Sequence, residues 1–352
     1  MAEGAPPPSA PVLVRLSSPD RLPKRLETIR TPTLVENALT AWPAAQWDLD
    51  KIPHTEKILA VRIWPKGKPL YETECIFEAV TMEQFCRWLS LKEGQTGPLA
   101  KYPQTKFAAY LDYCDMSDIF QPQVLDAIDW RTVGGVQRNG ADSCIWLGSA
   151  RTCTPTHFDT YGLNMVAQLC GIKRWTLHPP SARILASRVP YEESSVFADT
   201  PERQPGGLRV ELYPGEVLII PKGWWHYVET VSAYALSVNT WLPSPDDVEA
   251  RLREAFVRTV ASSLLSGVGP DGASNWLNPS EEEWTMGECL ESLREALSAA
   301  RPSLGTRVSA ASVRELVDSL CTGHVLDAAV EAFCHRVQHG DLNRPARKRL
   351  KA

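Results

Sequence analysis

The chain has 352 residues, 43% of them hydrophobic and 22% charged, which is the balance of a globular protein with one large domain and an accessory module. Its formal charge of -5 excludes bulk attraction to nucleic acid or an anionic membrane as the main basis of function. No apolar run approaches the ~18 residues of a membrane span, and the N-terminus lacks the pattern of a signal peptide. We therefore expect a soluble intracellular protein of the cytoplasm, with the nucleus as a further location.

Cysteine and histidine usage narrows the chemistry further. The nine cysteines are odd in number and contain no C-x-x-C pair, which argues against a disulfide framework or a structural zinc site. Reduced thiols, mostly buried as small apolar residues, are expected instead. Because the chain has only seven histidines, a motif that uses two of them is informative.

The N-terminal part is predicted to form a mixed segment behind an unfolded leader. Residues 1–24 are rich in Pro, Ser, Gly and Ala and predict a disordered leader. Short strands are predicted at 32–35, 58–64 and 106–113. Residues 81–84 have the pattern of a helix cap, and apolar residues follow them at helical spacing.

The segment 143–242 is predicted to consist of short antiparallel strands separated by Pro and Gly turns. Many short strands at such spacing are typical of a closed double-sheet barrel or jelly roll. We therefore predict a mainly β fold with helices (α+β), in which residues 25–245 form a β-rich barrel or jelly-roll domain. Its strands are expected at 144–147, 164–169, 174–178, 216–220 and 235–241.

After residue 246 the apolar pattern becomes helical. Apolar residues recur at helical spacing from Val248 to Leu264, and capping-box patterns at 280–283 and 312–315 each precede a helical run. Residues 246–340 are therefore predicted to form a C-terminal helical module. The basic residues of 341–352 predict a solvated tail, and a nuclear-import or anion-binding element is the alternative.

The segment from Thr154 to Asp159 carries the first part of a candidate site. Side chains at i and i+2 of a strand leave on the same face, so His157 and Asp159 can converge on one point inside a barrel. Alone this H-x-D triplet is weak evidence, because a surface strand with a polar face gives the same pattern.

His226 supplies a third potential ligand. It follows a buried strand and its Pro221 stop, and Trp224 and Trp225 directly precede it. Taken alone, His226 could equally be a core histidine packed among aromatic rings. Together with the H-x-D pair it would complete a facial set of two histidines and one carboxylate, which suits non-haem Fe(II) and its oxygen chemistry.

Several strings of the chain are long and compositionally unusual. They include Pro32-Thr33-Leu34-Val35, Trp146-Leu147-Gly148-Ser149, Gly171-Ile172-Lys173-Arg174-Trp175, Trp224-Trp225-His226-Tyr227-Val228-Glu229, Asn239-Thr240-Trp241 and Trp276-Leu277-Asn278-Pro279. With the facial set, the strings between about residues 31 and 242 make this part of the chain similar to the JmjC branch of the cupin-fold 2-oxoglutarate oxygenases. The resemblance implies that residues 25–245 form a double-stranded β-helix domain of the cupin type, and the string 276–279 supports the narrower likeness that follows. Within that branch the resemblance extends to members that associate with a small heat-shock protein.

This resemblance implies a role for each matching residue. Fe(II) would be held by His157, Asp159 and His226. Lys173 would meet the distal carboxylate of 2-oxoglutarate, and a lysine among apolar neighbours is costly unless such a partner is present. Arg174 is the better candidate for a solvated residue at the sheet edge. The remaining pocket residues implied by the resemblance are Thr154 and Tyr110, as hydroxyl partners of the same carboxylate, and Asn164 and Asn239.

Two features depart from the family pattern. The chain has one residue more between Asp159 and Asn164 than the relatives we would compare it with, and one residue reverses the parity of a strand. Asn164 would face the pocket only if a bulge intervened, for which Gly162 is well placed. The stretch 198–212 is short and rich in Pro and Gly, so an altered substrate rim is expected.

Two classes of function remain. The first is a dioxygenase that uses Fe(II), 2-oxoglutarate and O2 to hydroxylate a protein side chain, or to demethylate it through hydroxylation, with succinate and CO2 as products. A substrate of nucleic acid is disfavoured by the acidic balance. The second is a binding protein that holds a small heat-shock protein with little or no catalysis. The resemblance also makes the C-terminal helices a candidate homodimer interface, with packing against the barrel as the alternative.

Overall fold

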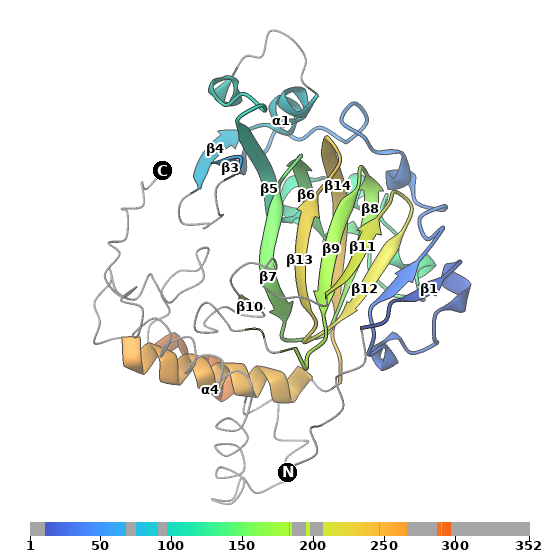
Figure 1. Cartoon of the computed structure of the whole chain (residues 1–352), viewed down its shortest axis with the longest axis vertical. Coiled ribbons are helices and arrows are strands. Elements are labelled where there is room, and N and C mark those ends of the chain that lie inside the picture. The colour runs from blue at the N-terminus through green and yellow to red at the C-terminus, as the bar shows by residue number, and fades with distance from the viewer. Residues whose placement is uncertain are drawn as a thin grey trace, which may run out of the picture.

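The computed structural model describes residues 11–67, 75–90, 97–182, 184, 195–197, 207–245, 247–265, 287–289 and 291–296. In this part of the chain the strands form two sheets that lie face to face (Figure 1). The sheets are mostly antiparallel, and a few helices lie around them. The predicted α+β jelly-roll fold of the cupin type is therefore confirmed.

The larger sheet has the strand order β1-β2-β12-β8-β14-β6-β5-β3-β4 among the described residues. All its pairs are antiparallel except β1 with β2. In chain order its strands are β1 (Val14–Leu16), β2 (Thr33–Val35), β3 (Leu59–Pro65), β4 (Ile76–Val80), β5 (Phe107–Asp115), β6 (Cys144–Ser149), β8 (Leu163–Cys170), β12 (Val217–Pro221) and β14 (Tyr234–Leu242).

The smaller sheet has the order β10-β7-β13-β9-β11 in the same part of the chain, and its pairs are antiparallel. It places the H-x-D strand β7 beside β13, which carries His226. Its strands are β7 (Cys153–Asp159), β9 (Lys173–His178), β10 (Ser195–Phe197), β11 (Leu208–Leu212) and β13 (Trp225–Thr230).

The α-helices of the described residues are α1 (Met82–Leu89), α2 (Met116–Ile119), α3 (Pro122–Leu125) and α4 (Asp247–Leu265). The helix cap predicted before α1 is present: the Thr81 hydroxyl accepts the Gln84 N–H at 3.2 Å, and the Gln84 side chain accepts the Thr81 N–H at 2.9 Å. None of the described helices is long and apolar enough to cross a membrane. Short 3-10 helices occupy Pro19–Arg21, Leu26–Thr28, Pro43–Gln46, Pro98–Lys101, Trp130–Thr132 and Gly140–Asp142.

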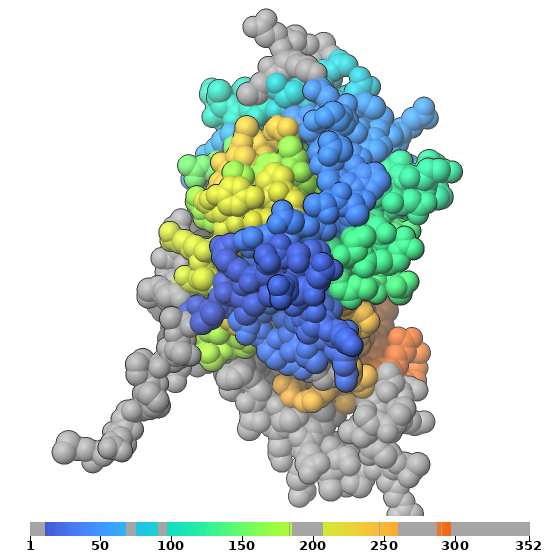
Figure 2. Space-filling model, turned by 90° about the vertical axis from the view of Figure 1, so that its right-hand side faces the viewer, coloured from blue at the N-terminus to red at the C-terminus, as the bar shows by residue number. Residues whose placement is uncertain are grey.

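The larger sheet is covered on both faces. One face packs against the smaller sheet, with Trp175, Leu218 and Val228 in that layer. The other packs against the N-terminal segment and helix α1, where Trp42 and Trp88 are buried. Figure 2 shows the N-terminal segment, in blue, spread over the face of the molecule seen there. Burial on both faces explains why β8 and β12 are almost continuously apolar rather than alternating.

The predicted leader 1–24 is wrong for the residues that the structure describes from residue 11 onward. β1 pairs in parallel with β2, and the Val14 N–H donates to the Pro32 carbonyl at 3.0 Å. Leu13 and Leu16 pack against the two cores. Composition suggested disorder, but a few apolar residues and the free edge of β2 are sufficient to order this segment. Residues 1–10 lie outside the described residues.

The helix predicted after residue 246 is present as α4, and residues 287–289 and 291–296 are also helical. The other predictions for this region, which are the capping boxes at 280–283 and 312–315 and the basic tail 341–352, lie outside the described residues. The described cysteines are free thiols, but of these only Cys86 and Cys289 are buried, whereas most were expected to be.

Candidate metal centre

Two neighbouring strands of the smaller sheet bring the predicted ligands together. His157 and Asp159 leave β7, and His226 leaves β13 directly opposite His157 in the pairing. The ligand atoms of the three side chains all lie within 4.8 Å of one another, and all three residues are buried. The structure therefore assembles the triad that the sequence predicted.

The two imidazoles are oriented by backbone carbonyls. His157 Nδ1 lies 2.8 Å from the Pro155 carbonyl oxygen, and His226 Nδ1 lies 2.9 Å from that of Trp224. A proton on each Nδ1 satisfies these carbonyls and makes Nε2 the atom with a lone pair that could bind a metal. Burial, together with nearby His226, holds the pKa of His157 well below its ordinary value. His157 is therefore in the neutral form that binds metal.

Asp159 is held by a chain of amide and indole groups. Its Oδ2 accepts from Asn164 Nδ2 at 3.1 Å and from Trp241 Nε1 at 3.2 Å, so Oδ1 remains for a metal. Asn239 Nδ2 donates to Asn164 Oδ1 at 2.9 Å, and Trp146 Nε1 donates to Asn239 Oδ1 at 2.7 Å. Both predicted asparagines thus face the interior, in a network that ends on a ligand carboxylate.

The inward position of Asn164 results from a turn rather than from a bulge in its strand. Gly162, between β7 and β8, has a φ of +67°, which is in the left-handed region. This turn takes the chain from the smaller to the larger sheet, so Asn164 reaches Asp159 from across the barrel. The extra residue lies in this turn and not within a strand. Strand parity therefore does not determine the direction of the Asn164 side chain.

A bulge does occur on β7, between the predicted Thr154 and His157. His157 pairs with His226 and Thr154 pairs with Val228, so two residues of β7 face one residue of β13. In a regular strand Thr154 and His157, three residues apart, would point to opposite faces. The extra residue of the bulge brings both side chains to the same face. Thr154 is consequently buried on the same side as the ligands.

Lys173, the first residue of β9, lies in the interior beside β13, the strand that carries His226. Only 3% of its surface is exposed. Its Nζ donates to Ser237 Oγ at 2.7 Å and to the Tyr110 phenol at 3.3 Å, and it lies 6.0 Å from the centre of the Trp146 ring. The structure therefore brings together Lys173, Tyr110 and Thr154, the three residues predicted to meet a carboxylate.

When Lys173 is protonated, its positive charge is not balanced by its hydrogen-bond partners, which are the neutral hydroxyls of Ser237 and Tyr110. Arg62 forms a buried ion pair with Asp112 next to the Tyr110 ring, so this pair contributes no net charge. Burial lowers the pKa of Lys173 to about 7, although Asp112 acts in the opposite direction. Burial also raises the pKa of Tyr110, which keeps its phenol a neutral hydrogen-bonding group. An anion bound at Lys173 would restore its charged form.

Arg174, the neighbour of Lys173, points away from this interior. Its side chain is 39% exposed and forms ion pairs of 2.9 Å with Glu211 and Glu229 on adjacent strands. The interpretation of Arg174 as the solvated residue of the pair agrees with this position. Successive side chains of β9 leave opposite faces, so only one of the two cations can enter the barrel.

Sequence reasoning missed several residues of the pocket. Ser237 lies two residues before Asn239 on β14, so the i, i+2 rule could have found it. Arg62 interrupts an otherwise apolar strand, which is a usable signal of a buried charge. Asp112 and Trp241 carried no such signal, because their partners are far away in the sequence.

Comparisons with known proteins identify the family of the chain. The model of the cupin-like domain family matches residues 19–248, so the chain belongs to the cupin-like domain family. Its relatives are of the JmjC type: the lysine-specific demethylase JMJ30 of Arabidopsis thaliana is 27% identical, over 60% of this chain and 49% of its own length. A solved structure, that of E. coli ycfD, has a TM-score of 0.38 at 14% identity and covers 76% of this chain and 63% of its own.

More similar relatives are HSPB1-associated proteins. The HSPB1-associated protein 1 homolog of Danio rerio is 36% identical over 75% of this chain and 64% of its own length. HSPB1-associated protein 1 of Bos taurus is 34% identical over 83% of this chain and 65% of its own length. The matched region therefore spans just under two thirds of these relatives.

Proposed function

We propose that this protein is a dioxygenase dependent on Fe(II) and 2-oxoglutarate that hydroxylates a protein side chain, or demethylates it through hydroxylation. One observation carries the proposal: a buried lysine with hydroxyl partners lies inside the same barrel as a buried set of two histidines and one aspartate. A metal site alone would fit many functions. A buried lysine near it can pair with an anion, and this combination fits a dicarboxylate co-substrate.

The donor set fits Fe(II). Two imidazoles whose Nδ1 atoms face backbone carbonyls, and one carboxylate whose Oδ2 is hydrogen-bonded, can offer Nε2, Nε2 and Oδ1 as three ligands on one face, which would leave the other positions of the metal open. Such a set suits non-haem Fe(II) better than structural zinc, which takes four protein ligands. His157, Asp159 and His226 would hold the metal, and Asn164 and Trp241 would fix the carboxylate.

The other side chains bind and orient the co-substrate. Fe(II) with 2-oxoglutarate and O2 supplies the oxidation that converts a substrate C–H bond into C–OH, with release of succinate and CO2. Lys173 would pair with the distal carboxylate by charge, and the Tyr110 hydroxyl, 3.3 Å from Lys173 Nζ, and the buried Thr154 hydroxyl would hydrogen-bond it. Trp175, whose ring centre lies 5.8 Å from that of His226, keeps water from that side of the site.

Binding of 2-oxoglutarate should take up a proton above about pH 7. The pKa of Lys173 is lowered to about 7 by burial, so most of this lysine is neutral at about pH 8.5 in the free protein. A bound carboxylate favours the ammonium, so affinity should fall by up to about tenfold per pH unit above this pKa and be level well below it.

Calorimetry in buffers of different ionisation enthalpy, with Mn(II) saturating, measures this proton uptake directly. We expect a value approaching one proton at about pH 8.5 for the parent protein. Lys173→Arg keeps its charge and should take up almost none. Equal uptake by the two proteins would contradict the assignment of the proton to Lys173.

The substrate class is proposed from the relatives. The name of one relative is that of a lysine-specific demethylase, and the name of another refers to association with HSPB1. Both names point to a protein as the molecule that is modified or bound. We therefore propose a protein side chain as the substrate, and a small heat-shock protein or one of its clients as the place to begin the search. The acidic balance of the chain gives no support to a nucleic-acid substrate.

Turnover of 2-oxoglutarate tests the proposed activity. The protein with Fe(II), ascorbate and O2 should form succinate, slowly alone and faster with cell extract as a source of substrate. His226→Ala should reduce this to background, because one of the three facial ligands is lost. Succinate is quantified by mass spectrometry, and calorimetry first establishes that the parent protein holds both metal and 2-oxoglutarate.

A second candidate function is binding of a small heat-shock protein without catalysis, which the names of the HSPB1-associated relatives favour. The same assay separates the two. The binding function would replace the proposed enzyme under two conditions. The parent protein, loaded with metal and 2-oxoglutarate, would form no succinate, and both it and His226→Ala would retain a small heat-shock protein on a column.

A further inference from the structure

Helix α4 lies across one end of the two sheets, where the chain enters and leaves the metal-ligand strands (Figure 1). Two loops meet there. One is the turn 160–162, which directly follows Asp159, and the other is the turn 222–224, which leads into β13 and His226. Each loop therefore determines where a ligand strand ends or begins.

The two loops are bonded to each other through their backbones. The Lys222 N–H donates to the Gly162 carbonyl at 3.0 Å, and the Gly223 N–H donates to the Asp159 carbonyl at 2.8 Å. The second of these bonds ends on the backbone of a ligand residue. A shift of one loop is thus transmitted to the other, and with it the distance between Asp159 and His226 changes.

Asp247, in the first turn of α4, is bonded to both loops. Its Oδ1 accepts the Gly162 N–H at 2.9 Å and the Lys222 ammonium at 2.9 Å. Its Oδ2 accepts the Ser244 N–H at 2.6 Å, and the residue is only 4% exposed. One buried carboxylate thus ties the loop after Asp159, the loop before His226 and the start of the helix.

The geometry around Gly162 leaves little freedom for another arrangement. A Cβ at this residue would lie 2.3 Å from the Leu242 carbonyl oxygen, and its φ of +67° strains any other residue. Gly162 is therefore fitted between Leu242 and the carboxylate of Asp247, which accepts its N–H.

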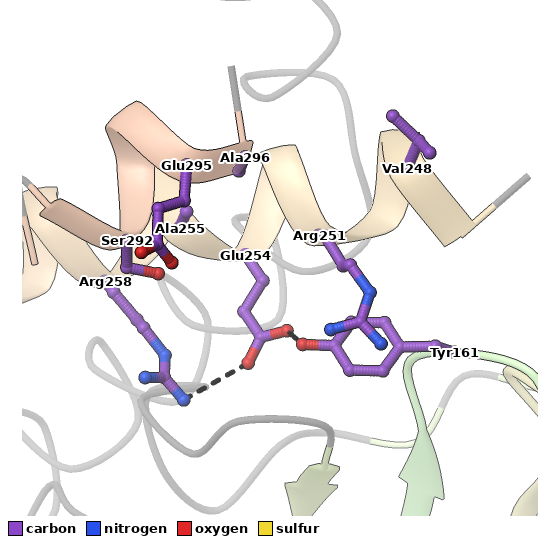
Figure 3. A pocket seen from close by; sticks show the side chains of 9 residues that line it. All are labelled: Tyr161, Val248, Arg251, Glu254, Ala255, Arg258, Ser292, Glu295 and Ala296. Carbon is purple, nitrogen blue, oxygen red and sulfur yellow. Dashed lines mark hydrogen bonds and ion pairs between the residues drawn. The ribbon is translucent and has the colours of Figure 1, made fainter. Parts of the chain in front are cut away.

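The same helix contacts the first loop a second time. The Tyr161 hydroxyl donates to Glu254, which also pairs with Arg258 at 3.3 Å, and the Arg251 guanidinium lies 4.2 Å from the centre of the Tyr161 ring. These side chains line a pocket of about 200 Å³ between α4 and residues 291–296 (Figure 3). None of the three metal ligands lines this pocket, so α4 acts on the site through the loops.

We propose that Asp247 is a positioning residue of the metal centre, and that α4 is a working part of this centre rather than a separate C-terminal module. Asp247 fixes the separation of the Asp159 and His226 strands through Gly162 and Lys222. The inference rests on the proposed metal site, and it assigns a role to a residue that touches neither metal nor co-substrate.

Metal affinity of matched variants tests this role. Mn(II) binding is measured by calorimetry on Asp247→Ala, Asp247→Asn and Glu249→Ala. Asp247→Ala should bind Mn(II) about tenfold more weakly, the lower end of the range for residues that support metal ligands. Asp247→Asn keeps an oxygen for the Gly162 N–H and should recover part of this loss. Glu249, on the same helix with its side chain 74% exposed, is the control and should leave the affinity unchanged.

A purely structural role of Asp247 makes a different prediction. It would lower the melting temperature of the metal-free protein while leaving Mn(II) affinity and the EPR line shape of bound Mn(II) as in the parent. A loss of about threefold or less in Asp247→Ala, or an equal loss in Glu249→Ala, overturns the proposal. If neither Asp247 variant folds, Mn(II) affinity is measured on Lys222→Met instead. This side chain is partly exposed, so the protein should tolerate the change, which removes the ammonium that pairs with Asp247. Unchanged affinity in Lys222→Met would overturn it as well.

The failure of this inference is distinguishable from failure of the proposed function. A parent protein that binds neither Mn(II) nor Fe(II) overturns both. A parent protein that binds the metal and converts 2-oxoglutarate to succinate, while Asp247→Ala binds Mn(II) as well as the parent, overturns the inference alone.

Discussion

Asp159→Ala should bind Fe(II) or Mn(II) at least about a hundredfold more weakly than the parent protein, and should lose bound metal on a desalting column. The carboxylate is the only anionic member of the set, and the described residues supply no second metal-ligating group of three or more beside it, so its loss removes both a ligand and the negative charge that attracts the cation. Calorimetry with Mn(II) under anaerobic conditions measures the affinity.

Two further variants calibrate this result. Asn164→Ala removes one hydrogen bond to the carboxylate and keeps all three ligands, so we expect a loss of about tenfold. Asp118→Ala removes an exposed carboxylate outside the smaller sheet and should have no effect. Equal metal content in Asp159→Ala and the parent would show that the triad is not the metal site.

Lys173→Ala should weaken 2-oxoglutarate binding by about a hundredfold or more while metal affinity changes little. Loss of one partner of a buried charge pair costs about 3–5 kcal/mol, and each 1.4 kcal/mol is about tenfold in affinity. Arg62 cannot substitute for the lysine, because its guanidinium is bonded to Asp112. The remaining partners, Tyr110 and Thr154, offer only neutral hydroxyls.

Arg174→Ala is the matched control for this prediction. It removes a cation from the next residue of the same strand, but that cation is partly exposed and paired with two surface glutamates. We expect a change of less than about threefold, since exposed ion pairs contribute little. Titration of both variants with 2-oxoglutarate in the presence of Mn(II) gives the comparison. A larger loss in Arg174→Ala than in Lys173→Ala would move the carboxylate site to the other face of β9.

Much of the fold followed from local patterns. The cap at Thr81, the helix from Asp247 and the five strands predicted between 144 and 241 depend on propensity and spacing, which act over a few residues. Strand β1 did not follow, because its order comes from the edge of β2 and not from its own composition.

For the site, the sequence by itself determined the ligand types. His157 and Asp159 share a face because of strand parity, and His226 is placed by the strand that ends at Pro221. The carboxylate role of Lys173 is implied by the family resemblance, and the need of an interior lysine for a partner is consistent with it. The placements of the ligands could be inferred because each depends on residues near it along the chain.

Only the tertiary structure decided how the rest of the chain serves these ligands. The bulge that turns Thr154 inward, the left-handed turn at Gly162 and the buried Arg62–Asp112 pair each depend on contacts between strands that are distant in sequence. The same is true of Asp247, which lies 85 residues beyond the backbone group of Gly162 that it accepts. Parity and propensity are local properties, whereas the partner of a buried polar group is fixed by how the whole chain packs.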